Sequence, residues 1–306
     1  MTQALDRLTL LQTFVRIVDA GSISAAARDL GLSQPSASRQ LAQLEARLNA
    51  QLLRRTTHAL SLTEAGSALL ADARVLLDGW DVLEERHGTA TGQVRGTLSV
   101  VAPVALGQTH LVDFVAAFQR DFPVVALNWQ LNDEPIRFAE AGCDCWIRVG
   151  PVPDERLVVR RLGRVERLLV ASSGLLAEHG VPATPTQAGR LPLLALAPFD
   201  GGTVTLSRPG RSPVTLSPEV RVRTNNIFAI KQAALADLGL AVLPTWLIAR
   251  ELAAGELVAV PAGYRAPSLD LHVAYPSGRH TPLRLRRFLE RLAEAVPAIS
   301  GIDAVA

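Results

Sequence analysis

The stretch SQPSASRQLAQLEARL, residues 33–48, decides the fold of the first part of the chain. Ser33 is suited to cap a helix, and Pro35 falls in the first turn, where a missing N–H group costs little. Apolar residues then recur at spacings of four, three and four, which predicts one stripe facing a core. These residues are Ala37, Leu41, Leu44 and Leu48. The stretch is therefore expected to form an amphipathic helix.

The opposite face of this expected helix carries short polar side chains and one guanidinium group. It consists of Pro35, Ser36, Ser38, Arg39, Ala42 and Gln43, with Gln34 at the exposed N-terminal end. Short side chains allow another surface to approach closely, and Gln and Arg can reach base edges while Ser and backbone N–H groups can reach phosphates. The pattern favours a DNA-binding surface, and the alternative is an ordinary polar face on a three-helix bundle.

Two further helices are expected before residue 33. Apolar residues at helical spacing predict a first helix that ends at Gly21. These residues are Leu8, Leu11, Phe14, Val15 and Val18. Ser22 or Ser24 is suited to cap a second helix over residues 25–30, and Gly31 supplies the left-handed residue after it. Two short helices joined by residues 31–33 predict a helix-turn-helix.

Residues 51–63 alternate around a polar tip, which predicts a small β-hairpin, or wing. Arg54, Arg55 and His58 would lie on this wing, within reach of phosphates or a minor groove. Thr63 is then expected to cap a long helix with Glu64 in its first turn.

Apolar and small residues along this long helix alternate in fours and threes, which is typical of a coiled-coil seam and favours a dimerisation helix. They are Leu62, Gly66, Leu69, Ala73, Leu76, Trp80 and Leu83. The alternative is that this face packs on its own domain. A dimer suits DNA recognition, because two heads read a two-fold site.

A family resemblance rests on the same residues. AGSISAAARDLGLSQPSASRQL (20–41), Leu44-Glu45 and LTEAG (62–66) together closely resemble the LysR-type transcriptional regulators. In that family the helix matching residues 34–48 enters the major groove. Leu53 stands where Phe is common, which affects packing, and His58 stands where Arg is frequent, which predicts a weaker or pH-dependent wing contact.

The resemblance implies that Gln34, Pro35, Ser38 and Arg39 contact DNA, together with Arg55 on the wing. With the exposed face added, the expected DNA-binding residues are Ser33, Gln34, Pro35, Ser36, Ser38, Arg39, Gln43, Arg55 and His58.

Beyond a connector at residues 88–92, strands and helices alternate. Strands are expected at 98–104, 124–131 and 143–149, with helices at 108–120 and 134–141, which predicts a parallel sheet covered by helices. A long stretch, 157–172, then leads into a second lobe. Later elements are expected at 204–222 (strands broken by a turn at 208–211), 226–238 (helix), 240–243 (strand), 245–254 (helix), 269–275 (strand) and 282–295 (helix).

The chain is expected to leave the first lobe near residue 162 and to return near 266. Two α/β lobes joined in this way resemble the periplasmic-binding-protein fold, as in LysR effector domains. The predicted fold class is therefore α/β, with a winged helix-turn-helix domain (1–62), a linker helix and connector (63–92) and an effector-binding domain (93–306). Lobe I is expected to span about 93–162 and 266–306, and lobe II about 163–265.

Ligands of open α/β lobes lie beyond the carboxyl ends of strands, where helix N-termini favour anions. Residues at these ends are the candidate effector contacts, and the resemblance implies an effector held between the lobes at matching positions. They are Ala102, Pro103, Val104, Asn132, Asp133, Arg148, Asn225 and Asn226. Many family members have Ser or Thr near the position of Val104, so a more apolar or differently held effector is expected. Alternatively, Arg148 is a structural salt-bridge partner, and Asn225 and Asn226 are helix caps.

Composition narrows the functional classes. The 306 residues suggest about two domains, and 48% hydrophobic with 20% charged residues is globular composition. The net charge of +2 indicates little about partners, although residues 1–62 carry a modest positive excess and 63–92 a negative one. No apolar stretch reaches the ~18 residues of a membrane span, and no secretory signal is evident.

The two cysteines, Cys143 and Cys145, exclude a disulfide framework. They are interpreted as core residues, with a thiol switch or a metal pair as alternatives, and a reducing, cytoplasmic compartment is expected.

The sequence thus favours a transcriptional regulator that binds double-stranded DNA and a small-molecule effector, as a homodimer or a homotetramer built from two dimers. No cofactor, metal or catalytic residue is expected, since Gly-x-Ser-x-Gly, phosphate-loop and HExxH motifs do not occur. One alternative is a constitutive DNA-binding regulator whose second domain serves only oligomerisation. A solute-binding protein or an enzyme is disfavoured.

Overall fold

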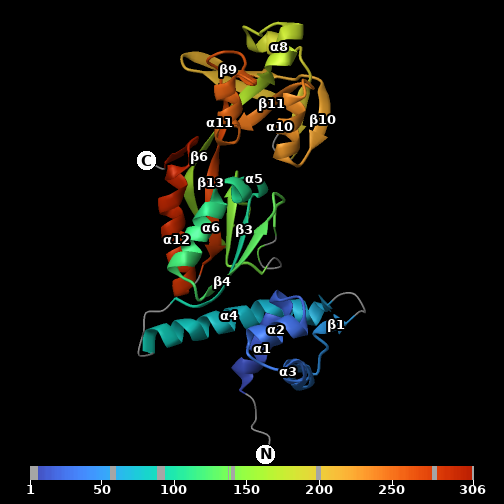
Figure 1. Ribbon diagram of the computed structural model, residues 1–306, viewed down its shortest axis with the longest axis vertical. Coiled ribbons are helices and arrows are strands. Elements are labelled where there is room, and N and C mark those ends of the chain that lie inside the picture. Colours follow the sequence, from blue (N-terminus) through green and yellow to red (C-terminus); the bar gives the residue numbers. More distant parts are fainter. Residues whose placement is uncertain are drawn as a thin grey trace, which may run out of the picture. The chain divides into compact units, whose positions relative to one another are not determined.

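The computed structural model describes residues 6–55, 60–87, 94–136, 138, 142–197, 201–277 and 281–304 (Figure 1). The chain forms two compact units. The N-terminal unit comprises residues 1–95 with the later segments 136–143 and 278–286, and the C-terminal unit comprises 96–135, 144–277 and 287–306. Each unit has its own architecture.

The N-terminal unit is a winged helix-turn-helix. Its elements are α1 (Arg7–Asp19), α2 (Ile23–Asp29), α3 (Gln34–Leu48), β1 (Leu53–Arg55), β2 (Leu60–Leu62) and α4 (Glu64–His87). The Ser22 hydroxyl accepts a hydrogen bond from the Ala25 N–H at 3.1 Å, so Ser22 and not Ser24 caps α2. Gly31 has the expected left-handed backbone, with φ +65°. The predicted helices and turn are therefore confirmed.

The core of this unit lies between α1, α3 and the wing. Leu10 and Ile17 are fully buried beside Phe14, whereas Val15 and Val18 only pack against this core. The apolar stripe predicted for the first helix therefore coincides only partly with the face that the structure buries. Gln40 is buried as well, and its Oε1 accepts a hydrogen bond from the Thr13 hydroxyl.

The predicted stripe of α3 is correct for its first three residues and wrong for the last. Leu48 is 46% exposed, because the core contacts of α3 end with Leu44, one turn earlier. Asn49 then ends the helix in the left-handed conformation, with φ 49°.

The long helix α4 begins as expected, because the Thr63 hydroxyl accepts the Gly66 N–H at 2.9 Å. The prediction of one continuous dimer seam is wrong for its first half. Gly66 lies against the Leu52 carbonyl, and Ala73 is 1% exposed within its own unit. The second half is exposed, with Leu76 at 53%, Trp80 at 42% and Leu83 at 49%.

The first lobe of the C-terminal unit has parallel strands covered by helices. The parallel strands are β3 (Gly96–Ala102), β4 (Val125–Leu131) and β5 (Cys145–Val149), and the helices are α5 (Val104–Thr109), α6 (Leu111–Asp121) and α12 (Leu283–Ala295). The helix predicted over 108–120 is two helices that meet at His110. Residues 137 and 139–141 of the helix predicted over 134–141 lie outside the described residues, and residues 134–136 are not helical, so the predicted start of this helix is wrong. Cys143 and Cys145 are both buried.

The second lobe continues the same sheet. Its elements are α8 (Ser173–His179), α9 (Pro185–Ala188), β7 (Leu193–Leu196), β8 (Val204–Arg208), β9 (Arg211–Leu216), β10 (Val220–Thr224), α10 (Ile227–Leu235), β11 (Leu240–Pro244), α11 (Thr245–Ala254) and β12 (Leu257–Ala259). A short helix, η1 (Val296–Ala298), and β14 (Ile302–Ala304) follow α12. The sequence interpretation missed α8, α9, β7, β12 and β14.

Two long antiparallel strands join the lobes. β6 (Leu157–Ser172) and β13 (Ala266–Pro276) pair from Pro276↔Leu157 to Ala266↔Arg167. Figure 1 shows them running together between the lobes. β6 then pairs with β11, so the sheet order is β10-β7-β11-β6-β13-β5-β3-β4, with β12 and β14 also on β6. The two predicted crossings, near 162 and 266, fall on these strands.

Candidate functional site

The polar face of α3 is accessible on the N-terminal unit. Ser33, Gln34, Pro35 and Arg39 are exposed, and Ser36, Ser38 and Gln43 are half-buried. The opposite face holds Ala37, Leu41 and Leu44 in the core. Apart from Leu48 at its C-terminal end, the sequence therefore assigned both faces of this helix correctly.

Local hydrogen bonds organise the start of α3. The Ser33 hydroxyl accepts the Ser36 N–H at 3.3 Å and lies 2.8 Å from the Ser36 hydroxyl. The Arg39 Nη2 donates to that same Ser36 hydroxyl at 3.3 Å. The guanidinium is thus held along the helix surface. An α-helix with short side chains and one oriented Arg fits the width of a DNA major groove.

The wing is fastened to α3 by Glu45. Its Oε1 accepts the backbone N–H groups of Leu52 at 2.8 Å and Leu53 at 3.3 Å, directly before and at the start of β1. The Thr63 hydroxyl donates to the Gln51 carbonyl at 2.7 Å from the other end of the hairpin. Glu45 is therefore a positioning residue for the wing, a role that its place in the family motif did not reveal.

The structure describes the two strands of the wing, and residues 56–59 lie outside the described residues. β1 and β2 pair antiparallel, with Arg54 opposite Ser61 and Arg55 opposite Leu60. The Arg54 side chain is exposed. His58 lies outside the described residues, so the expected tip contact stays a prediction.

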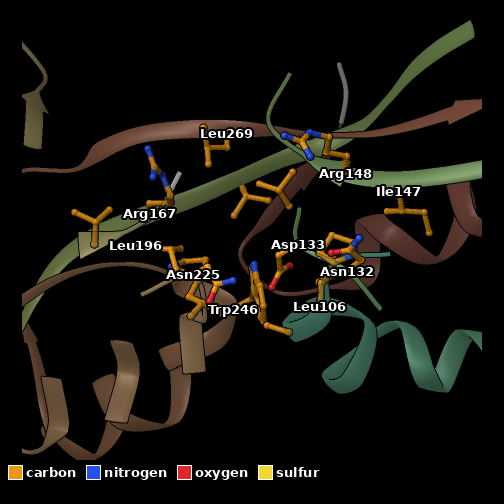
Figure 2. Close-up of a pocket in the computed structure, with 18 of the residues that line it drawn as sticks. Leu106, Asn132, Asp133, Ile147, Arg148, Arg167, Leu196, Asn225, Trp246 and Leu269 are labelled. Atoms are coloured by element: carbon orange, nitrogen blue, oxygen red, sulfur yellow. The ribbon is translucent and has the colours of Figure 1, made fainter. Parts of the chain in front are cut away.

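A second candidate site is a cavity of about 80 Å³ in the C-terminal unit (Figure 2). Five of the eight candidate effector residues line it, namely Pro103, Asn132, Asp133, Arg148 and Asn225. They come from both lobes, as the strand-end rule predicts.

The other three candidates have structural roles. Ala102 is fully buried in β3, and its carbonyl accepts the Asn132 N–H at 2.9 Å. The Val104 N–H donates to Asp133 Oδ1 at 3.0 Å. Asn226 caps α10 by accepting the Ala229 N–H at 3.0 Å, as its alternative interpretation proposed.

Asp133 is the acidic group of the cavity. Burial raises the pKa of its carboxyl group, the Val104 N–H opposes this shift, and the neighbouring Glu134 adds to it. Glu134 also accepts a hydrogen bond from the Asn225 amide at 3.2 Å, and this bond joins the two lobes beside the cavity.

Arg148 is a nearly buried cation on β5, with 9% of its surface exposed. Its Nε donates to the Pro151 carbonyl at 2.8 Å, and its guanidinium carbon lies 4.7 Å from the ring centroid of Trp146. Burial lowers the pKa of this guanidinium, and Glu134 partly opposes the shift. Among the described residues Arg148 forms no salt bridge, contrary to the alternative interpretation from the sequence.

The sequence missed several lining residues, above all Trp246 and Arg167. Trp246 follows the end of β11 at the start of α11 and meets His110 edge to face, with ring centroids 5.4 Å apart. Because Trp246 follows a predicted strand, the strand-end rule could have identified it from the sequence. Arg167 lies inside β6, where the strand-end rule does not apply, and its Nε donates to the Pro267 carbonyl at 2.8 Å. Figure 2 shows both with Asp133, Asn225 and Arg148 around the cavity.

Two negative findings complete the description. Within the part of the chain that the structure describes, no three His, Cys, Asp or Glu side chains gather closely enough to hold a metal ion. No helix of the described residues has both the length and the apolar character that crossing a bilayer requires.

A winged helix-turn-helix with an accessible polar helix and a two-lobed α/β unit with a mostly apolar cavity occur here in one chain. This combination defines the class of ligand-responsive DNA-binding regulators. Family comparison makes the class specific. Residues 8–67 match the model "Bacterial regulatory helix-turn-helix protein, lysR family", and residues 91–297 match "LysR substrate binding domain". The chain belongs to the LysR family of transcriptional regulators.

Individual relatives agree along the whole chain. The HTH-type transcriptional regulator PtxR of Pseudomonas aeruginosa is 33% identical over 299 residues, covering 96% of each chain. The HTH-type transcriptional repressor PA14_22550 of another P. aeruginosa strain is 33% identical, covering 95% of this chain and 92% of the other. Among solved structures, the LysR-type regulator CrgA of Neisseria meningitidis has 26% identity and a TM-score of 0.58, covering 94% of this chain and 97% of CrgA. Regulators of this family bind DNA and small-molecule effectors and form oligomers.

Proposed function

We propose that α3 reads an operator in the major groove through Ser33, Gln34, Pro35, Ser36, Ser38, Arg39 and Gln43, with Arg55 and His58 on the wing at the flanking backbone or minor groove. The observation that carries this proposal is the accessibility of the polar face of α3 while its other face is buried. Arg39 is the strongest candidate for base recognition, because a guanidinium can donate two parallel hydrogen bonds to guanine.

The C-terminal unit is the sensor in this proposal. A small molecule in the cavity contacts Asp133 and Arg148 from one lobe and Asn225 from the other. Such a ligand favours the lobe arrangement in which it makes the most contacts, and it alters operator affinity by its differential affinity for the two arrangements. The role is non-catalytic, and the protein acts in the cytoplasm, where its DNA target lies. The proposed domains are 1–62, 63–92 and 93–306, with lobe I at about 93–162 and 266–306 and lobe II at about 163–265.

We also propose that the protein is a homodimer through the second half of α4, and that two dimers associate into a homotetramer. Leu76, Trp80 and Leu83 are apolar, exposed and spaced by four and three residues. Two exposed stripes of this kind bury each other in a coiled coil. The resulting pair of heads would read a two-fold operator.

The test of DNA recognition compares Arg39→Ala with Arg47→Ala, a matched control at the other end of α3 that is also exposed. Both variants lose one positive charge, so both should weaken binding to random duplex alike. Arg39→Ala should in addition lower discrimination between operator and random DNA by about 1–3 kcal/mol at fixed salt. Unchanged discrimination in Arg39→Ala would argue against the proposed role of α3.

A constitutive regulator, in which the second domain serves only oligomerisation, is the competing function. Operator affinity should be measured with and without small carboxylic acids and amines that stabilise the full-length protein against heat. Affinity that no stabilising compound changes would favour the constitutive alternative.

A further inference from the structure

The leading N–H group of α5 is not available to a ligand anion. Its leading N–H group, that of Val104, already donates to the carboxylate of Asp133 at 3.0 Å. Helix starts attract anions through such N–H groups, and here the chain supplies the anion itself. A ligand carboxylate placed beside Asp133 and Glu134 would meet two like charges. The acidic side of the cavity therefore favours a hydrogen-bond donor.

Arg148 brings a positive charge to the same cavity. It lines the cavity with 9% of its surface exposed, and its Nε is used by the Pro151 carbonyl. Its two terminal amino groups make no hydrogen bond to any described residue, and Glu134 acts on it only from a distance. Charges that are buried in native proteins are normally paired. A nearly buried guanidinium with uncommitted donors in a cavity therefore points to an anionic group on the ligand.

The cavity that Asp133 and Arg148 share is otherwise lined largely by apolar side chains. Trp146 lies under the Arg148 guanidinium, and Trp246 also lines the cavity (Figure 2). The skeleton that joins the two polar ends of a ligand thus meets aromatic side chains. The cavity, about 80 Å³ in volume, restricts this skeleton to a small one.

Building on the proposed effector function of this cavity, we propose that the effector is a small hydroxy- or amino-substituted carboxylic acid. Its carboxylate lies on the terminal amino groups of Arg148, and its hydroxyl or amino group donates to Asp133. The ligand is thus oriented with its acid on β5 and away from the start of α5.

The test measures binding of four single-ring probes to the full-length protein without DNA, by isothermal titration calorimetry. The probes are 3-aminobenzoate, benzoate, benzamide and aniline. We expect 3-aminobenzoate to bind most tightly and benzoate next, with benzamide and aniline clearly weaker. Arg148→Gln should weaken both carboxylates on the order of 10- to 100-fold, the usual effect of losing a buried charge-assisted hydrogen bond, and should leave benzamide unchanged.

Two further variants check the geometry. Arg167→Gln is the matched control, because Arg167 also lines the cavity but is only half-buried, and its loss should change carboxylate affinity far less. Asp133→Asn keeps an oxygen for the Val104 N–H and removes the charge. It should therefore abolish the preference for 3-aminobenzoate over benzoate.

Three results would overturn the inference: unchanged carboxylate binding in Arg148→Gln, benzamide binding as tightly as benzoate, or no probe binding at millimolar concentration. If Arg148→Gln does not fold, Arg148→Lys replaces it. The lysine variant keeps the charge and should keep the preference for benzoate over benzamide, so loss of that preference would also overturn the inference.

Operator binding separates this inference from the proposed function. Carboxylates that bind in the expected pattern without changing operator affinity would refute ligand control and leave the site chemistry standing. Operator affinity that responds only to amines or neutral compounds would refute the proposed site chemistry and leave ligand control standing.

Discussion

Replacing Gly66 by alanine is expected to destabilise the N-terminal unit, although alanine is the better helix residue. Gly66 lies in the first turn of α4, directly against the segment that leads into the wing. A Cβ atom at this position would lie 2.0 Å from the Leu52 carbonyl oxygen and 2.9 Å from its carbon. The carbonyl is not free to retreat, because it accepts the Thr63 N–H at 3.0 Å. The added methyl group must therefore displace the wing or the start of α4.

The size of the effect follows from two opposing contributions. Gly to Ala gains about 1 kcal/mol in a helix interior, and overpacking of a close contact costs about 1–3 kcal/mol. A distance of 2.0 Å to backbone places Gly66 at the upper end of that cost. We expect a net loss of about 2 kcal/mol, which lowers the melting temperature of a unit of this size by roughly 10 °C.

Gly79, on the same helix, is the matched control. A Cβ atom there would meet nothing within 4 Å. Gly79→Ala should therefore stabilise the unit by about 0.5–1 kcal/mol. The two substitutions are identical in chemistry and differ only in their surroundings.

The assay is differential scanning calorimetry of the full-length variants, with hydrogen exchange of the amides at residues 51–66 as a local probe. Gly66→Ala should lower the transition of the N-terminal unit and accelerate exchange in the wing. A melting temperature that rises in Gly66→Ala as it does in Gly79→Ala would refute the close contact between α4 and the wing.

Three other outcomes are expected. Trp80→Glu should weaken self-association in sedimentation equilibrium, while Val75→Glu, about 140° away around the same helix and 74% exposed, should not; equal effects would exclude a seam at Trp80. Glu45→Ala leaves two backbone N–H groups of the wing unsatisfied, so it should cost about 1–3 kcal/mol in urea unfolding and reduce operator affinity. Lys231→Met removes the nearer of two cations from the buried carboxylate of Glu251, which lies 2.8 Å from the lysine and 3.2 Å from the exposed Arg250, and should cost about 3 kcal/mol, whereas Lys231→Arg should cost much less; similar losses would show that charge pairing is unimportant there.

The features that the sequence predicted well are decided by neighbours a few residues away. Ser33 caps α3 by bonding the N–H three residues later, and Gly31 turns the chain because glycine tolerates positive φ. The heptad pattern of α4 was less informative. It marks apolar positions but not what covers them, so Ala73 turned inward to its own unit while Trp80 remained exposed.

The cavity shows the same distinction on a larger scale. Asn132 and Asp133 follow the end of β4, and the strand-end rule found them. Arg167 lies within β6 because this strand is long enough to pass from one lobe to the other, and only the pairing with β13 reveals where the crossing falls. The crossing also determines how such a site responds to ligand. Asp133 and Arg148 stand in one lobe, and Asn225 and Trp246 stand in the other. A ligand held by Asp133 and Arg148 whose skeleton also contacts Asn225 or Trp246 therefore favours the arrangement that keeps the lobes close, whereas a ligand held by one lobe alone shifts no equilibrium, however tightly it binds.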